Sequence, residues 1–187
     1  MPMKHIQQLF ATRGKDDANS TTLANTLDKD IQTVFNSIEK FIFELLQNAD
    51  DAGLPDTPVD VSFAVKENLL IFSHNGKHFD FDDVEAISDN AQRRKRGKEI
   101  DTEKTGYKGI GFKSVFVVAD SVHIISGPYS FRFDKNFPKW QEHAPDNPDG
   151  NYPWQIVPIL TPPEELPPAM LVDTAKVNFI LALRAGV

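Results

Sequence analysis

The chain contains no cysteine and no long run of apolar residues, and both absences narrow its class. Because none of its 187 residues is a cysteine, neither a disulfide framework nor thiolate chemistry is available. No apolar run approaches the ~18 residues that a membrane-spanning helix requires, so no membrane partner is predicted. The N-terminal residues MPMKHIQQLF lack the apolar stretch of a secretory signal. These features predict an intracellular protein, either cytoplasmic or nuclear.

Positive charge is also scarce. The chain has 20 Lys and Arg residues against 27 Asp and Glu residues, which gives a net charge of −7 and a pI near 5.2. This balance argues against binding of nucleic acid by the surface as a whole. One basic run, RRKR at residues 93–96, leaves a local contact with nucleic acid or phosphate open. We favour the simpler interpretation that the run belongs to a solvated loop.

The remaining composition is that of an ordinary globular domain. The chain is 40% hydrophobic and 25% charged, which is typical of such proteins. Its length is sufficient for one domain with a substantial core. No internal repeat with a period of ~20–50 residues is visible. We therefore expect a single domain over residues 1–187.

Apolar periodicity predicts a mixture of helices and strands. Residues 30–51 have apolar positions at three- and four-residue steps, which predicts one long amphipathic helix. Residues 1–30 are weakly periodic and are expected to form a loop and a short helix. Further helices are expected at residues 79–89 and 112–120, and strands at residues 59–65, 68–76, 121–126, 129–134 and 176–184. This order predicts an α+β fold, a two-layer sandwich with helices on one face of a mixed, mainly antiparallel sheet.

Two segments are expected to be irregular. Residues 90–105 are highly charged and nearly devoid of apolar side chains, which is typical of a mobile surface loop. Residues 138–168 hold nine of the thirteen prolines. Proline removes a backbone donor and fixes φ, so this segment is expected to contain neither a regular helix nor a central strand. We interpret it as a proline-rich irregular insertion.

A row of polar residues interrupts the apolar pattern of the predicted long helix. Glu44, Asn48 and Asp51 are spaced by four and three residues, which places their side chains on one face. Taken alone, such a face is usually solvated. Here apolar residues occupy much of the circumference, which favours a polar face directed toward a site.

The glycine-rich segment GYKGIGFKS, residues 106–114, suggests phosphate binding without matching two common motifs. Phe112 interrupts the Walker pattern, and Ser114 stands where a dinucleotide fingerprint would have its third glycine. Closely spaced glycines still allow several backbone N–H groups to approach a phosphate, and Lys108 and Lys113 could neutralise its charge. A tight connection in which the glycines serve geometry alone is an equal alternative.

Three segments, taken in order, resemble the GHKL or Bergerat-fold ATPases. ELLQNADDA at residues 44–52 is similar to the first motif of that family, E-x-x-x-N-x-x-D-A. HNGKHF at residues 74–79 is similar to the second, D-x-G-x-G, and GYKGIGFKS to the third, G-x-x-G-x-G-F. The family includes DNA gyrase, the ninety-kilodalton heat-shock chaperones, MutL-type repair proteins and histidine kinases. Within the family, the amino-acid sequences of these segments most resemble the sacsin-type branch.

The resemblance implies ATP and Mg²⁺ as cofactors and assigns roles to individual residues. Glu44 matches the general base that activates water, and Asn48 matches the residue that holds Mg²⁺. Residues 90–105 fall where the family has its mobile lid. The other residues that the resemblance places at the nucleotide are Asp51, Ala52, His74, Asn75, Gly76, Lys104, Gly106, Tyr107, Lys108, Gly109, Ile110, Gly111, Phe112 and Lys113.

The sequence departs from the family pattern at the second motif. His74 occupies the place of the aspartate that accepts a hydrogen bond from adenine, and His78 occupies the place of the second glycine. A neutral histidine can also accept a hydrogen bond, and the side-chain oxygen of Asn75 is an alternative acceptor. The family usually has a threonine in a late strand of the fold. This chain has Val177 at the expected place.

The resemblance implies a Mg²⁺-dependent domain that binds and hydrolyses ATP, with lid closure and homodimer formation in the ATP-bound state. Further domains are expected C-terminal to this chain. The departures at His74 and His78 keep open an alternative, a nucleotide-dependent interaction module that does not hydrolyse. A histidine kinase domain is less favoured, because the 30 or so residues before the first motif leave little room for a phosphoacceptor helix. Nucleic-acid binding rests only on residues 93–96.

Overall fold

The computed structural model describes residues 1–14, 19–34, 39–89, 111–140 and 151–186. Its α-helices are α1 (Pro2–Arg13), α2 (Ser20–Val34), α3 (Lys40–Asp51) and α4 (Phe81–Ile87). Its 3-10 helices are η1 (Gly111–Val117), η2 (Trp154–Ile156), η3 (Pro163–Glu165) and η4 (Pro168–Met170). Its strands are β1 (Val61–Lys66), β2 (Leu69–His74), β3 (Ala119–Ser126), β4 (Tyr129–Asp134), β5 (Ile159–Leu160) and β6 (Val177–Leu183).

The strands form one six-stranded sheet in the order β1-β2-β6-β3-β4-β5. Every pairing among them is antiparallel. The last strand of the chain, β6, lies in the middle of the sheet, where Phe179 faces Phe72 of β2 and Ile124 of β3. The predicted α+β fold is confirmed.

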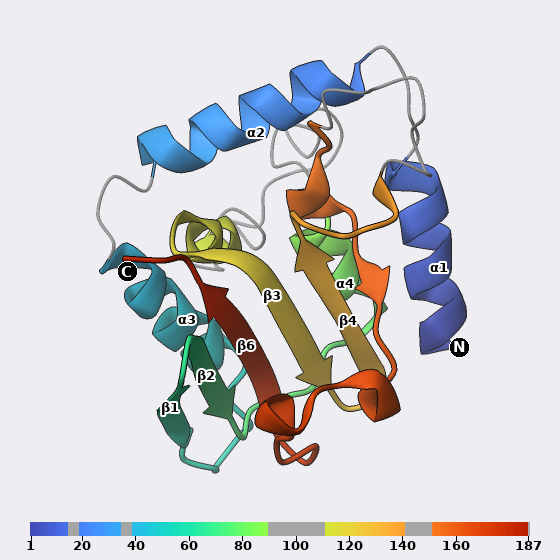
Figure 1. Ribbon diagram of the computed structural model, residues 1–187. Coiled ribbons are helices and arrows are strands. Elements are labelled where there is room, and N and C mark those ends of the chain that lie inside the picture. Colours follow the sequence, from blue (N-terminus) through green and yellow to red (C-terminus); the bar gives the residue numbers. More distant parts are fainter. Residues whose placement is uncertain (15–18, 35–38, 90–110, 141–150, 187) are drawn as a thin grey trace, which may run out of the picture.

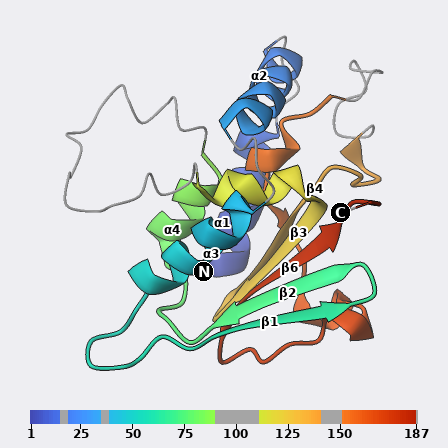
Figure 2. The same cartoon turned by 90° about the vertical axis from the view of Figure 1, so that its left-hand side faces the viewer.

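The α-helices cover one face of this sheet, as the two views show (Figures 1 and 2). The main hydrophobic core lies between the layers and combines residues from α1, α2, α3, α4 and η1 with one face of the strands. Its largest fully buried side chains include Phe72, Phe116, Phe131 and Phe133. The burial of each such ring contributes roughly 1.5–3 kcal/mol, so this aromatic layer helps to hold the helices on the sheet.

The opposite face of the sheet has a smaller apolar cluster. Leu69, Ile71, Ile125 and Ile180 are buried there, and Leu166, Ala169, Met170 and Val172 pack against them. The chain around η3 and η4 therefore covers part of the second face. Strand β1 is exposed along its whole length, as is expected of an edge strand.

The prediction of one long helix over residues 30–51 is wrong. That range contains the end of α2 and all of α3, and residues 35–38, between the two, lie outside the described part of the chain. Ile31 of α2 and Phe41 of α3 are both buried in the main core. The apolar period continues from one helix to the next because both helices face the same core, so periodicity alone did not reveal the break.

The N-terminal region is also more helical than predicted, with α1 of 12 residues and α2 of 15. Threonine hydroxyls in these helices bond carbonyls one turn earlier, as in Thr12 to Gln8 and Thr26 to Thr22. These bonds satisfy the threonine hydroxyls within the helix. In the part of the chain that the structure describes, no helix is long and apolar enough to cross a membrane.

Candidate functional site

A pocket opens between α3, α4 and the sheet. It combines polar and aromatic side chains from segments that are far apart in the sequence. Its lining residues are Asn48, Asp51, Ala52, His74, Lys77, Phe79, Asp83, Ala86, Ile87, Phe112 and Phe179. Five of the predicted site residues are therefore brought together here: Asn48, Asp51, Ala52, His74 and Phe112.

Helix α3 supplies the polar wall of the pocket. Phe41, Leu45 and Ala49 bury the opposite face of this helix in the core, and this burial fixes its rotation about its axis. Asn48 and Asp51 consequently line the pocket. No described residue forms a hydrogen bond with the Asn48 side chain. The Asn48 amide is therefore available to a ligand.

Glu44 lies one turn before Asn48 and contacts the third motif directly. A Cβ built on Gly111 would collide with the Glu44 carboxylate, so any larger residue there would displace the Glu44 side chain from its present position. Burial raises the pKa of Glu44, because a carboxylate partly withdrawn from water disfavours its charged form. None of the described residues forms an ion pair or a hydrogen bond with the Glu44 side chain. Glu44 itself is not one of the residues that line the pocket.

The HNG turn packs onto the C-terminal end of α3. The backbone N–H of Lys77 donates to the carbonyl of Ala52 over 2.7 Å, and a Cβ on Gly76 would lie only 2.6 Å from the same oxygen. Gly76 is therefore required for this close approach. Asn75 points elsewhere, because its amide donates to Pro58 O at 3.1 Å and accepts from Asp60 N at 2.8 Å. The side-chain oxygen of Asn75 thus already accepts a hydrogen bond from the chain before β1.

His74, the last residue of β2, is 1% exposed and lines the pocket. Burial, followed by the neighbouring His78, lowers the pKa of His74 to about 4, so its ring is neutral at pH 7. The backbone N–H of Gly76 donates to Nδ1 of His74 over 3.1 Å. Since Nδ1 is the acceptor, the single ring proton of the neutral form resides on Nε2.

The two predicted residues that follow Gly111 diverge. Phe112 is 3% exposed, lines the pocket and packs against the rings of Phe116, Phe133 and Phe179. Lys113 points into the core, where its ammonium nitrogen donates to Ile87 O at 2.5 Å and to Gln155 O at 2.6 Å. The expected phosphate contact of Lys113 therefore has no support in this arrangement.

Several predictions fall outside the described residues. They are the lid at residues 90–105, and Lys104, Gly106, Tyr107, Lys108, Gly109 and Ile110 at the glycine-rich segment. Other residues of the pocket were not anticipated, namely Lys77, Phe79, Asp83, Ala86, Ile87 and Phe179. Helix α4 itself was expected, but its sequence does not indicate which element its apolar face meets.

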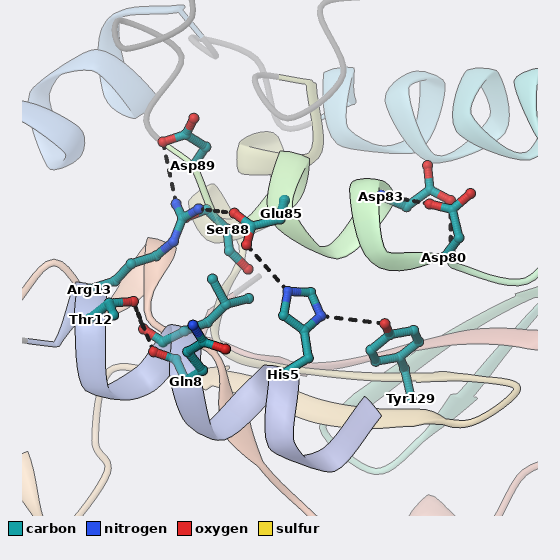
Figure 3. A network of polar contacts seen from close by, with 11 residues as sticks. His5, Gln8, Thr12, Arg13, Asp80, Asp83, Glu85, Ser88, Asp89 and Tyr129 are labelled. Atoms are coloured by element: carbon teal, nitrogen blue, oxygen red, sulfur yellow. Dashed lines mark hydrogen bonds and ion pairs between the residues drawn. The ribbon is translucent and has the colours of Figure 1, made fainter. Parts of the chain in front are cut away.

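Helix α4, which forms one wall of the pocket, is anchored at both ends. At its start, Asp80 and Asp83 form a reciprocal capping box. At its end, Arg13 of α1 donates to Ser88 O and pairs with Glu85 at 2.6 Å and Asp89 at 3.3 Å (Figure 3). The N-terminal helix thereby fixes the position of this wall.

His5 adds a second contact between α1 and α4. Its Nε2 lies 3.3 Å from Glu85 and its Nδ1 lies 3.4 Å from the hydroxyl of Tyr129 on β4 (Figure 3). The His5 ring also stacks on Phe81 with centroids 3.7 Å apart. Through His5 and Arg13, α1 holds α4 against the sheet.

Comparison with known proteins identifies the family of this chain. The family described as the Sacsin domain matches residues 62–157, about half of the chain. This chain belongs to the sacsin domain family. Human sacsin is 30% identical over 152 residues, which cover 73% of this chain and 3% of sacsin. Protein NO VEIN of Arabidopsis thaliana is 35% identical over 104 residues, or 55% of this chain and 4% of that protein.

This sacsin-family domain is also a distant relative of bacterial chaperones. Chaperone protein HtpG of Fusobacterium nucleatum is 28% identical over 176 residues, which cover 80% of this chain and 26% of HtpG. The chain therefore spans only a small part of the length of each of these relatives. The resemblance to the HSP90-like GHKL branch is confirmed at this distant level.

The residues of the pocket are compatible with a magnesium ion that is held mainly by the phosphates of a bound substrate. The described residues contain no cluster of three or more His, Cys, Asp or Glu side chains that could hold a metal, so a cage built from protein groups alone is not found among them. Mg²⁺ commonly keeps several waters and takes one or two protein oxygens together with substrate phosphates. Asn48 lines the pocket and its side-chain amide bonds none of the described residues, which suits that mode.

Proposed function

We propose that this domain binds ATP together with Mg²⁺ and hydrolyses it. The observation that carries the proposal is the convergence of the three motif segments on one place. Asn48, His74 and Phe112 line one pocket, and Gly111 contacts Glu44. Membership of the sacsin family and distant homology to HtpG support the same function.

In the proposed reaction, Glu44 accepts a proton from a water molecule as the water oxygen attacks the terminal phosphorus. The bond from that phosphorus to the bridging oxygen breaks, and ADP leaves with its electron pair. The raised pKa of Glu44 makes it a stronger base than an ordinary carboxylate. Asn48 would hold the Mg²⁺ ion, and the bound ion would neutralise the charge of the phosphates.

The test is a Glu44→Gln substitution, which keeps the size of the side chain and removes its basicity. We expect MgATP to bind with an unchanged Kd and to be hydrolysed about 10²- to 10⁴-fold more slowly, the usual effect of losing a general base. Asp50→Asn is the matched control, because Asp50 is an exposed acid on the same helix and lies away from the pocket. Unchanged turnover in Glu44→Gln would remove Glu44 from the mechanism.

A second candidate is a nucleotide-dependent interaction module that does not hydrolyse ATP. It is favoured by the departure from the family pattern at His74, whose tautomer does not reproduce the acceptor of the family aspartate. Tight MgATP binding with no phosphate release over hours would support this module. Release that depends on Glu44 would exclude it.

We further propose that nucleotide binding is coupled to lid closure and homodimer formation, and that further domains follow this chain. The great length of sacsin and NO VEIN relative to the matched segment supports the last point. Light scattering with and without MgATP would test dimer formation. A mass that stays monomeric at saturating MgATP would contradict it.

A further inference from the structure

We propose that the outer edge of strand β1 pairs with β1 of a second copy of this chain, antiparallel and centred on Phe63, so that the two sheets join into one. β1 is an end strand of the sheet (Figures 1 and 2), and no strand among the described residues pairs with its outer side. Soluble proteins normally protect such an edge with charged side chains, proline or a covering segment. The strand VSFAVK has no proline and a single charge, at its end.

An apolar row on β1 is open to solvent. Its members are Val61, Phe63 and Val65, whose exposed fractions are 42%, 42% and 70%. Phe63 stands opposite Phe72 of β2, a fully buried ring of the main core, and the two ring centroids are 4.8 Å apart. Directly opposed residues of antiparallel strands share a face, so the apolar row lies on the face of the sheet that carries the α-helices. The described helices bury Phe72 but leave the row beyond it uncovered.

The backbone groups of the apolar row are directed to the open edge. Lys66 and Leu69 close the two-residue turn between β1 and β2, so they form a hydrogen-bonded pair. At the other end of the strand, the N–H of Asn75 donates to the carbonyl of Asp60 over 3.2 Å. Hydrogen-bonded and non-bonded pairs alternate along antiparallel strands, so the even-numbered residues of β1 bond β2. The N–H and C=O groups of the apolar row therefore point away from β2.

A two-fold axis at Phe63 makes this edge complementary to itself. Phe63 then stands opposite Phe63 of the second copy, and Val61 opposite Val65, each as a hydrogen-bonded pair with its side chains on the helix-bearing face. Lys66 stands opposite Asp60 of the second copy. Both residues are exposed, and neither side chain forms an ion pair with another described residue. The pairing thus matches apolar with apolar side chains and positive with negative charge.

The neighbouring registers lack this match. An axis at Ala64 places Glu67 opposite the apolar row, and an axis at Ser62 places Lys66 opposite Pro58. Both shifts separate the two opposite charges. The charge complementarity and the direction of the backbone groups therefore favour one register and one occupant, a second copy of this chain.

The pairing should be weak and independent of nucleotide. One pair of short strands buries less than the roughly 1,200 Å² below which complexes are typically transient, so we expect a dissociation constant on the order of 100 μM. The homodimer proposed above forms with ATP, whereas this one needs no ligand. It is therefore measured without MgATP, and its failure would leave the proposed function standing.

Two charge reversals test the register by sedimentation equilibrium. Asp60→Lys places a lysine opposite Lys66, and Lys66→Asp places an aspartate opposite Asp60. Like charges directly opposite one another are destabilising, so each variant alone should dimerise at least about fivefold more weakly than the wild type. An equimolar mixture of the two variants restores both opposite-charge pairs. It should form a heterodimer with about the wild-type affinity.

Asp50→Lys is the matched control, because it makes the same change at an exposed acid outside β1, on α3. This variant should dimerise as the wild type does. A wild-type domain that remains monomeric at about 1 mM would overturn the inference and leave the edge to a segment of another protein. A mixture of the two reversals that dimerises no better than either alone would also overturn it.

Amide hydrogen exchange gives a second readout in the unaltered domain, so the test does not depend on the folding of variants. The N–H of Phe63 points to the open edge and should exchange more slowly as the protein concentration rises. The N–H of Ala64 bonds β2 in the monomer and is the internal control, with exchange that is independent of concentration. Exchange at Phe63 that is equally independent of concentration would overturn the inference.

Discussion

Glu44 belongs to the first motif and Lys113 to the third, and the fold surrounds their ionisable groups in different ways. Lys113 is 5% exposed, and its ammonium nitrogen bonds the carbonyls of Ile87 and Gln155. Glu44 is half-buried and has no recorded partner among the described residues. A buried polar group that is fully bonded serves the fold, whereas one held near a pocket without a partner remains available to a ligand.

The same contrast separates the two walls of the pocket. The α4 wall is secured by Arg13, which bonds Ser88, Glu85 and Asp89. The α3 wall presents Asn48 and Asp51 to the cavity. The contacts that stabilise the fold are thus concentrated at α4, whereas the polar side chains that face the pocket lie on α3. Substitutions on the two sides should therefore change different properties.

Lys113→Met should produce the largest loss of stability. The substitution leaves the carbonyls of Ile87 and Gln155 without their donor in the core, and each unbonded buried acceptor costs about 1–3 kcal/mol. We expect the free energy of unfolding in urea to fall by about 3 kcal/mol. Lys135→Met, at an exposed lysine, is the control and should change it by less than about 0.5 kcal/mol. An equal effect at both positions would refute a structural role for Lys113.

Arg13→Met should have an intermediate effect. It removes the two ion pairs and the carbonyl bond that join α1 to α4, in a site where the Arg13 side chain is 14% exposed. We expect a loss of about 2 kcal/mol in urea unfolding, with a weaker affinity for MgATP because Ala86 and Ile87 of α4 line the pocket. Lys4→Met, on the exposed side of α1, should leave both quantities unchanged. Wild-type affinity in a destabilised Arg13→Met would show that α1 does not position the pocket.

Glu44→Gln should have the smallest effect on stability, and it should be a gain. Because the pKa of Glu44 is raised in the folded state, the folded protein binds more protons than the unfolded chain, and stability falls as the pH rises through these values. Removing the carboxylate abolishes this loss, so we expect a gain in the free energy of unfolding at pH 7 and a smaller gain at pH 4. The gain should be small, because Glu44 is only half-buried and solvent screens its charge. Thermal unfolding at the two pH values measures it. A gain that is larger at pH 4 would contradict the assignment.

The local elements near the pocket were largely predictable from sequence. Alternation in residues 59–65 and 68–76 predicted two strands, which are observed as the antiparallel pair β1 and β2. The helix predicted at residues 79–89 is observed as α4, which begins after Asp80 with a capping box formed by residues three apart in the sequence. These features depend on interactions within a few residues, which sequence patterns describe directly.

Features that depend on distant partners were not predictable. The break between α2 and α3 was hidden because Ile31 and Phe41 point to one core. The glycine-rich motif suggested a phosphate contact for Lys113, yet carbonyls from Ile87 and Gln155 hold it in the core. No local pattern encodes either outcome, since both partners are many residues away.

By itself, the sequence determined the three motif segments, the alternation of the strands and the capping of α4, because each depends on neighbouring residues. The tertiary structure alone decided that β6 completes the centre of the sheet, that Glu44 contacts Gly111 and that Nδ1 of His74 accepts from Gly76. The physical reason is common to all three. A side chain takes its rotamer, its protonation and its tautomer from the groups that packing brings against it, and only the folded chain brings those groups together.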